Sequence, residues 1–492
     1  MLIIQSVVDN FLAPIRAMRM RYLPLLMIYF AYGASSFSSI AVTFWVKDSL
    51  GLTPVELAAI GVWLALPWTI KMVFGQFGDS IHIFGSARKI YVWIGAAFMA
   101  AGALLLYGAA ASVPWILAWG NPTELYFSAM LLGVVGAVLQ DVMADAMSTE
   151  VVQRNERATE EINRDLGMVQ VLGRISLSFA AFMVAGLGGW LAQNFEYHQV
   201  FLMMLIIPVI SIIGISLVKL DPVPAKPVNW WVLGGGISFA IFSAFMGLSS
   251  VPFGQEIVVM VSLIVVCSLL WSIIKDLDDT TKNLIVLTVI VIFVFRAMPG
   301  VGVGSQWWMI DELGFSESFF GVLAQIGATL SIVGMWVFAR YITTKSAGYV
   351  LGWLTVLTTV LAWPIIGMYY GLHDWLGVSA HTVAIIDTAL ESPFGQLSMI
   401  PMLALIAIYA PRGNAATWFA LMTSLMNMAL STGALTTKYL NMVFVVDRGQ
   451  YDMLGYLMIS SNIIGFVLPM LAIYFCMTPS GRKIIRIKTK NS

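Results

Sequence analysis

The chain has 492 residues, of which 59% are hydrophobic and 11% are charged, and its formal net charge is zero. Soluble domains carry about 25% charged residues, and a water-soluble fold of this composition would expose too much apolar surface to stay dispersed. A neutral chain gives no reason to expect nucleic acid as a partner. The composition therefore predicts an all-α polytopic membrane protein whose solvent is the lipid bilayer.

The cysteines and histidines give no sign of a cofactor or of catalysis. Cys267 and Cys476 both lie in apolar runs, and the four histidines are scattered over separate segments. Neither a disulfide framework nor a metal site is therefore predicted. The sequence contains no H-E-x-x-H motif and no phosphate-binding P-loop. We expect no cofactor, no enzymatic activity and no ATP-driven pump.

Apolar segments of roughly 20 residues, long enough to cross a bilayer as a helix, recur along the chain. They form two sets of six with two more segments between the sets, at 22–46, 55–77, 90–111, 124–148, 166–192, 199–219, 229–249, 256–274, 284–306, 318–341, 347–371, 380–410, 413–437 and 454–477. The predicted architecture is the major facilitator fold, with two six-helix bundles and an extra two-helix hairpin between them. This gives 14 spans, with 12 as the alternative.

Proline and charge mark both edges of the extra hairpin. The stretches are DPVPAKPVN at 221–229 and KDLDDTTKN at 275–283, and such composition is typical of linkers. The predicted parts are an N-terminal bundle at 1–220, a linker with the hairpin at 221–283, a C-terminal bundle at 284–478 and a basic tail at 479–492.

The basic residues predict the orientation of the chain. With the N-terminus inside and alternating spans, 20 of the 26 Lys and Arg residues fall on the inner side and 3 on the outer side. Loops rich in Lys and Arg stay in the cytoplasm. We therefore expect both termini to be cytoplasmic and the protein to lie in a cell inner membrane.

A short repeat links the two halves. WVKDSLGLT at 45–53 and WMIDELGFS at 308–316 share four identities in nine positions, and each follows the first span of its half. Repeated halves of this kind are the architecture of many secondary transporters. Chance similarity of two outer loops is the alternative.

Arg296 is the most informative ionisable residue, because charged groups inside spans are costly and mark functional sites by default. It lies twelve residues into its predicted span, about 18 Å deep. Pro299 and Gly300 follow it, so the helix is expected to break or loosen there. A cation beside such backbone suits an anionic group of a substrate. A structural ion pair with a neighbouring helix is the alternative.

When 45–53 is aligned with 308–316, Arg296 of the second half corresponds in position to Gly33 of the first half. The hydroxyl-rich stretch that follows, including Ser35 and Ser36, is predicted to line the opposite wall of a substrate cavity. Small residues also allow close helix packing, and this interpretation fits equally well.

Asp141 and Asp145 are four residues apart and share a helix face. Arg174 on the next span enters from the same side, so a charge pair between the two helices is plausible, with Arg174 as a further substrate ligand. Two close carboxylates resist simultaneous ionisation, which would suit a proton carrier. A gate that never titrates is the alternative. Lys71 joins this set as a gating candidate, although snorkelling to the inner surface is the simpler interpretation.

Asp387 and Glu391 repeat the four-residue spacing on the tenth of the twelve main segments. They lie in its outer half, so they are not symmetry mates of the first pair. We treat them as candidates for substrate binding or coupling.

The loop between the second and third spans carries Asp79 and Arg88 in a G-x-x-x-D…R-K arrangement. Glycines there allow close helix approach, and Asp79 can face a helix N-terminus. This favours a conformational latch over a binding site.

Four groups of residues together resemble one family. They are KMVFGQFGDS at 71–80 with Phe84, Gly85 and RKIY at 88–91; QDVMADAM at 140–147 with Glu150; DELGFS at 311–316; and Asp387 to Glu391 with Gly395, Gln396 and Pro401, followed by PRG at 411–413 and TWFAL at 417–421. As a set they resemble the folate–biopterin transporter family of the major facilitator superfamily. The resemblance covers roughly 25–195 and 290–475.

The resemblance implies transport of pteridines or folates driven by protons. It also implies functional roles for Asp79, Arg88, Asp141, Asp145 and Asp387. Ser86 and Ala87 stand where the family is richer in arginine, and Ala415 stands where it has an acid. These departures bear on the substrate more than on the fold.

The predicted function is thus secondary active transport of a small polar, anionic solute by alternating access. A folate or pterin-like substrate and proton coupling follow from the resemblance. The expected partners are this small molecule, protons and the lipid bilayer, and the expected state is a monomer. Two alternatives stay open: a permease or exporter for another solute, such as a muropeptide or drug, and a receptor that does not transport.

Overall fold

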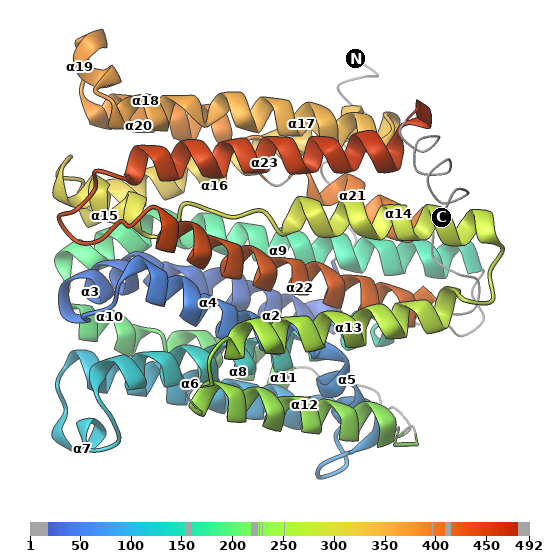
Figure 1. Cartoon of the computed structure of the whole chain (residues 1–492). Coiled ribbons are helices and arrows are strands. Elements are labelled where there is room, and N and C mark those ends of the chain that lie inside the picture. The colour runs from blue at the N-terminus through green and yellow to red at the C-terminus, as the bar shows by residue number, and fades with distance from the viewer. Residues whose placement is uncertain are drawn as a thin grey trace, which may run out of the picture. The chain divides into compact units, whose positions relative to one another are not determined.

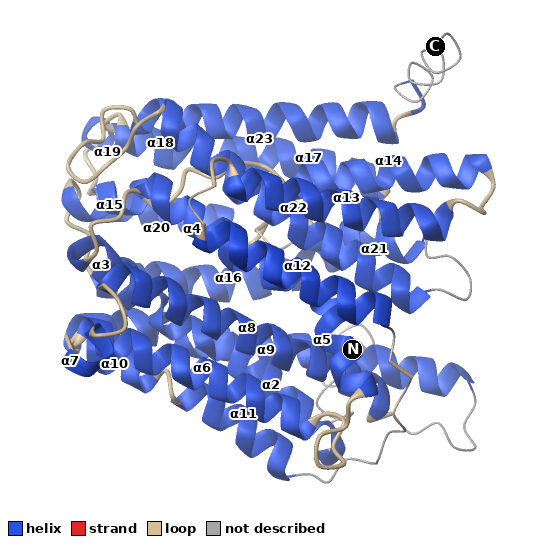
Figure 2. Cartoon of the chain, turned by 60° about the horizontal axis from the view of Figure 1, so that its bottom comes forward, coloured by secondary structure: helices blue, strands red, loops and turns tan. Residues whose placement is uncertain are grey.

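A computed structural model describes residues 18–152, 159–217, 225, 227–228, 230–249, 251–395, 397–408 and 415–480. Over these ranges the regular structure is helical, and the only β contacts are two isolated bridges in loops (Figures 1 and 2). Ten helices in these ranges are long and apolar enough to cross a membrane. The predicted all-α polytopic membrane protein is confirmed. The first 17 residues, the turn at 411–413 and most of the basic tail lie outside the described residues.

The ten helices coincide with ten of the fourteen predicted segments. The other four segments contain α12, α14, α20 with α21, and α22. The number of spans, the bundle boundaries and the orientation therefore stay predictions.

The chain forms two compact units, and the first contains residues 1–50, 71–239 and 320–322. Its helical elements are η1 Met20–Tyr22, α2 Leu23–Ala34, η2 Ser35–Ser38, α3 Ser39–Ser49, α5 Lys71–Ser80, α6 Lys89–Ala110, α7 Pro114–Leu117, α8 Pro122–Glu150, α9 Thr159–Asn194, α10 Tyr197–Met203, α11 Ile206–Leu217 and the first part of α12 Trp230–Leu248. Helix α2 packs against α8, α9 and α11, and α6 runs along α8.

The second unit contains residues 51–70, 240–319 and 323–492. Its helices are α4 Pro54–Thr69, α13 Gly254–Ile274, α14 Asp279–Arg296, α15 Gly304–Asp311, α16 Glu317–Thr344, α17 Ala347–Leu361, α18 Trp363–Tyr369, α19 Leu372–Leu376, α20 Ala380–Glu391, α21 Met399–Ile408, α22 Ala415–Val443 and α23 Leu454–Met477. Helix α22 packs along α4 and α13, and α23 packs on α14 and α17.

Local sequence explains where several helices begin. The side chains of Thr53 and Asn121 each accept a hydrogen bond from the backbone amide of a Glu three residues later. The carboxylate of that Glu in turn accepts one from the backbone amide of Thr53 or Asn121. These capping boxes satisfy amide groups that a helix start leaves open. Asp278 caps α14 with its side chain alone, which accepts a hydrogen bond from the Thr281 backbone amide, and its hydrogen bonds with Thr281 lower the pKa of its carboxyl group.

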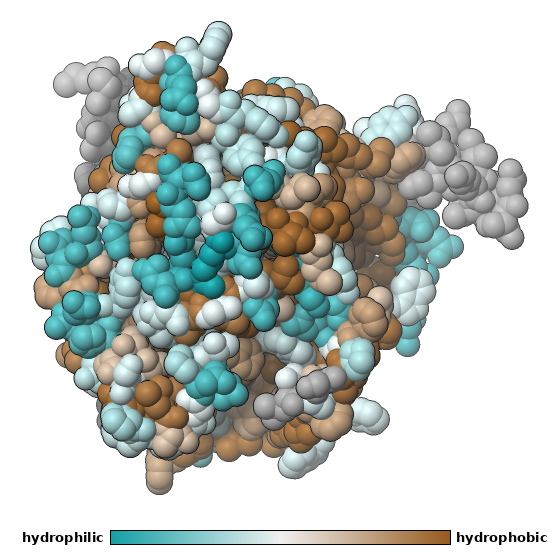
Figure 3. All heavy atoms as spheres, turned by 60° about the vertical axis from the view of Figure 1, so that its left-hand side comes forward, coloured by the Kyte–Doolittle hydropathy of each residue, from teal (hydrophilic) through white to brown (hydrophobic). Residues whose placement is uncertain are grey.

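Hydrophobic side chains are exposed along the helices, as expected for lipid contact. Trp190, Phe179 and Trp336 are each more than half exposed. Figure 3 shows hydrophilic residues gathered over loops at one end of the helices, beside hydrophobic residues on their flanks. On this face the polar residues at the ends of the helices are therefore separate from the apolar flanks, as expected for a protein in a bilayer.

Two predicted spans are interrupted: the break in 284–306 was expected after Arg296, whereas the prediction of one continuous helix over 380–410 is wrong. The predicted helix 284–306 ends at Arg296, and 297–303 is irregular before α15 begins. The predicted helix 380–410 is divided into α20 and α21 by a turn that contains Pro393. Proline removes a backbone donor and clashes with the preceding turn of a helix. The break expected after Arg296, where Pro299 follows, is confirmed, and Pro393 accounts for the break between α20 and α21.

Close packing of α2 on α9 depends on Gly33. A Cβ atom at this position would lie 2.1 Å from the Leu177 carbonyl oxygen, so a Gly33→Ala variant must separate the helices. We expect it to lower the midpoint of thermal unfolding in detergent, at a cost of about 1–3 kcal/mol. Gly133→Ala is the matched control, because a Cβ there meets nothing within 4 Å. Equal midpoints for the two variants would contradict this packing.

Candidate functional site

The first unit contains a charged cluster between α2, α5 and α8. The Lys71 ammonium group at the start of α5 forms an ion pair with Asp141 and lies 4.0 Å from Asp145. The Tyr29 hydroxyl on α2 donates a 2.6 Å hydrogen bond to Asp145. One turn of α8 separates the two carboxylates, so both reach the same lysine.

This arrangement corrects two expectations. Lys71 does not snorkel to the surface, because a carboxylate inside the unit offers it a direct ion pair. Arg174 was expected to pair with the α8 carboxylates, but its side chain is exposed. It lies within electrostatic range of Asp145, yet within the described residues it forms no ion pair with the α8 carboxylates.

A pocket lies next to this cluster, between α2, α6 and α8. Its walls are Ile28, Tyr29, Tyr32, Met99, Ala137, Gln140 and Asp141. Asp141 thus faces both the pocket and Lys71. Tyr29 and Tyr32 were not predicted as site residues, although two phenols three residues apart share a face of an otherwise apolar helix. That spacing was the available signal.

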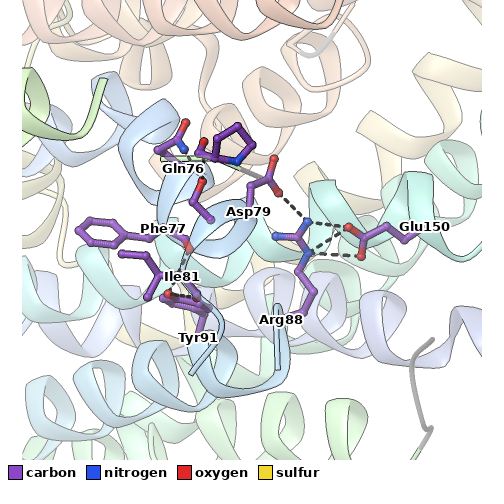
Figure 4. Close-up of polar contacts among 9 residues, drawn as sticks. Gln76, Phe77, Asp79, Ile81, Arg88, Tyr91 and Glu150 are labelled. Atoms are coloured by element: carbon purple, nitrogen blue, oxygen red, sulfur yellow. Dashed lines mark hydrogen bonds and ion pairs between the residues drawn. The ribbon is translucent and has the colours of Figure 1, made fainter. Parts of the chain in front are cut away.

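A second polar cluster joins α5, α6 and α8 at their ends (Figure 4). Arg88, only 5% exposed, donates from Nη2 to Asp79 at 2.7 Å and to Glu150 at 2.6 Å. Its Nε also donates to Glu150, at 3.1 Å. Burial opposes the charge on Arg88, but the hydrogen bonds and charges of Glu150 and Asp79 outweigh it and raise the pKa of the guanidinium.

Asp79 was expected to face a helix N-terminus, whereas in the structure it pairs with Arg88, and the contact of Arg88 with Glu150 was not predicted. The latch itself stays a prediction. The loop around this cluster is also held by Tyr91, whose hydroxyl donates to the carbonyl groups of Phe77 and Ile81 at 3.1 and 2.6 Å (Figure 4). The end of α5 is therefore tied to α6 and α8 by side chains. Movement of α5 relative to α8 must break the Arg88 contacts.

Ser35 and Ser36 lie in the 3-10 turn η2 that follows α2. Their hydroxyl groups donate to the carbonyl groups of Tyr32 and Gly33, at 2.6 and 3.0 Å. These bonds satisfy carbonyls that the helix break releases. Neither serine lines the pocket between α2, α6 and α8.

In the second unit, Arg296 is the last residue of α14. Its Nη1 donates to the Met399 sulfur at 3.1 Å, and its Nε is buried with no hydrogen-bond partner. Within the described residues no carboxylate pairs with it, so the alternative of a structural ion pair finds no support there. The guanidinium keeps donors for an additional acceptor.

The irregular segment after Arg296 is held by side chains of α22 and α23. Gly300 donates its amide to the Thr437 hydroxyl at 2.8 Å, and Asn441 donates to the Val301 carbonyl at 3.2 Å. Ser461 donates to the Pro299 carbonyl at 2.8 Å. Non-helical backbone inside a membrane protein requires such partners. The break in the helix is therefore stabilised by hydrogen bonds from other helices of the same unit.

Asp387 and Glu391 lie one turn apart on α20. Asp387 is 9% exposed, and its Oδ1 is buried without a hydrogen-bond partner, whereas Glu391 is exposed. Within the described residues no cation pairs with either carboxylate. A buried carboxylate without a cation is costly, so Asp387 is the more constrained member of the pair.

Comparison with known proteins now identifies the family. The model of the BT1 family matches residues 33–491, which is nearly the whole chain. The chain belongs to the BT1 family. A folate-biopterin transporter from Synechocystis sp. is 25% identical over 95% of this chain and 83% of its own length. Folate transporter 2 from Plasmodium falciparum is 21% identical over 94% of this chain and 88% of its own.

Solved structures support the fold of this BT1 family member. A POT family transporter in complex with a thioalcohol-conjugated peptide has a TM-score of 0.66 at 13% identity, covering 94% of this chain and 100% of its own. A structure from work on proton-dependent oligopeptide transporters has a TM-score of 0.64 at 14% identity, covering 95% and 99%. The predicted folate–biopterin transporter family and major facilitator fold are confirmed. The protein is a membrane transporter and not an enzyme.

The cluster of Arg88, Asp79 and Glu150 gives a test of stability. Replacing Arg88 with Gln leaves two carboxylates close together without their cation, so we expect a loss of about 3 kcal/mol in unfolding free energy. The double variant Arg88→Gln/Glu150→Gln should recover part of the loss. Thermal unfolding of the purified protein measures both.

Lys89→Gln is the matched control, because Lys89 is adjacent in sequence, is partly exposed and places its ammonium group 5.1 Å from the centre of the Trp93 ring. It should change the unfolding free energy by less than about 0.5 kcal/mol. An Arg88→Gln variant as stable as this control would contradict the latch.

Proposed function

We propose that this BT1 family member is a secondary active transporter that moves a folate- or pterin-like anion by alternating access, coupled to protons. Arg296 is the observation that carries the proposal. Its guanidinium is half-buried beside broken helix backbone, and within the described residues it pairs with no carboxylate. The names of the relatives from Synechocystis and Plasmodium supply the substrate class.

Arg296 has the chemistry needed to bind a carboxylate of the substrate. A guanidinium offers planar paired donors that match a carboxylate, while its present acceptor, a thioether sulfur, is weak. An arriving carboxylate would therefore gain a strong contact and displace a poor one. Ser35, Ser36, Arg174 and Glu391 stay proposals as further substrate ligands.

Asp387 is the proposed proton carrier of the second unit. Its buried oxygen without a hydrogen-bond partner favours a neutral carboxyl group unless a cation or water arrives. In the first unit, Lys71, Asp141 and Asp145 form the proposed coupling set, with Asp79 and Arg88 as gating residues. Proton binding at these sites would be linked to the accessible side of the transporter.

The role of Arg296 is tested with purified protein in proteoliposomes. We expect Arg296→Ala to reduce uptake of labelled folate at least about tenfold, since hydrogen bonds between charged partners contribute about 1.5–3 kcal/mol. Arg19→Ala is the matched control, because Arg19 is half-exposed and lies 3.9 Å from Asp165. Uptake by Arg296→Ala equal to the control would remove Arg296 from the site.

The role of Asp387 is tested by measuring two activities separately: exchange of folate across the membrane, and accumulation of folate driven by a pH gradient. Asp387→Asn mimics the protonated carboxyl group, so the variant should still exchange folate across the membrane. It should lose accumulation driven by an inward pH gradient. Asp374→Asn in α19 is the control, since its side chain is 83% exposed. Gradient-driven accumulation that survives in Asp387→Asn would contradict the proposed coupling.

A further inference from the structure

The two interrupted helices of the second unit meet at a contact between Arg296 and Met399. Arg296 is the last residue of α14, before the irregular segment 297–303, and Met399 is the first residue of α21, after the turn that follows α20. The Arg296 Nη1 atom donates a hydrogen bond to the Met399 sulfur at 3.1 Å. The sulfur therefore contacts the donor group that the proposed function assigns to the substrate.

This contact leaves the guanidinium incompletely satisfied, because a thioether is a weak hydrogen-bond acceptor. The Arg296 Nε atom is buried, and within the described residues it has no hydrogen-bond partner. A stronger acceptor in place of the sulfur would hold the guanidinium more firmly and would compete with a substrate carboxylate. Oxidation of methionine produces such an acceptor without a change of sequence, because the sulfoxide carries a polar oxygen.

We propose that Met399 is a site of reversible oxidation, at which conversion of the thioether to the sulfoxide ties Arg296 to the protein and prevents substrate binding. The oxidant is a peroxide. A sulfur lone pair attacks one oxygen of hydrogen peroxide, the O–O bond breaks, and the other oxygen leaves as water. Sulfur loses two electrons and the peroxide gains them. This inference rests on the proposed binding of a substrate anion by Arg296.

The surroundings of Met399 favour its oxidation over that of the next methionine on the same helix. The Met399 side chain is partly exposed, and the turn before it contains the exposed residue Gly395. Met402, on the same helix, is 0% exposed. Peroxide must reach the sulfur to react with it, so a small amount of peroxide should modify Met399 before Met402.

Oxidation is tested on the purified full-length protein in proteoliposomes. After treatment with hydrogen peroxide, mass spectrometry of peptides measures the oxidised fraction at Met399 and at Met402. Uptake of labelled folate, at a concentration below its KM, is compared with that of the same protein before treatment. We expect full oxidation of Met399 to reduce wild-type uptake at least about tenfold, since one hydrogen bond to a charged group changes an affinity by about this factor. Methionine sulfoxide reductases A and B with a thiol reductant should restore uptake.

Met399→Leu removes the sulfur with little change in side-chain volume. After peroxide treatment, this variant should keep the uptake that it has before treatment. Met335→Leu is the matched control, because Met335 is a partly buried methionine of the same unit that packs on a hydrophobic cluster containing Ile342. Peroxide should reduce uptake by this control as much as uptake by wild type.

Met399→Gln gives a second test that needs no oxidant, because it places an amide oxygen, a stronger acceptor than a thioether, beside Arg296. We expect it to raise the KM for folate about tenfold with little change in the maximal rate, since the amide competes with the substrate for the guanidinium. A merely structural defect would instead lower the maximal rate. Met335→Gln is the matched control and should keep the wild-type KM.

The outcomes separate this site from the transport function. Unchanged uptake after full oxidation of Met399, or equal losses in Met399→Leu and wild type, overturns the proposal. Oxidation of Met402 before Met399, or a wild-type KM in Met399→Gln, also overturns it. Each of these results leaves the proposed function intact if the untreated wild type takes up folate. Absence of folate uptake by the untreated wild type would instead overturn the proposed function, and this inference with it.

Discussion

The cost of an unpaired charge in apolar surroundings governs the polar architecture of this protein. An ionised group removed from water is stabilised only by a close opposite charge and by hydrogen bonds. In the first unit this requirement is met, since Lys71 faces Asp141 and Asp145, and Arg88 is held by Asp79 and Glu150. Each cation has two acids within reach, so each can lose one partner without being left alone.

Two ionisable residues of the second unit are in the opposite condition, although Lys438 and Glu256 of the same unit form an ion pair. Within the described residues, Arg296 has a thioether as its nearest polar partner, and Asp387 has a buried oxygen with none. Under the proposed function, a substrate anion would stabilise Arg296, and a proton would stabilise Asp387. The paired clusters of the first unit, together with Arg296 and Asp387, which have no charged partner within the described residues, suit the proposed transport cycle, in which contacts form and break.

Much of the fold followed from composition and from hydropathy, because lipid imposes a fixed length on each span. Ten of fourteen predicted segments are long apolar helices, and the family was recognisable from its polar motifs. The partner of Lys71 was not predictable, since a lysine near a helix end can equally reach the surface. Tyr29, Tyr32 and Glu150 were missed because their importance lies in contacts between helices that are distant in sequence.

The helix breaks connect these observations. Pro299 and the following glycines predicted a break after Arg296, but the sequence could not show that Thr437, Asn441 and Ser461 would hold it. Because those partners satisfy the open backbone, the break persists without a ligand, and α14 ends with the guanidinium at the edge of irregular chain. The substrate site proposed at Arg296 would therefore be organised before substrate arrives. Preorganisation of this kind lowers the loss of conformational entropy on binding. Under the proposed function, more of the binding free energy could then favour one conformation of the transporter over the other.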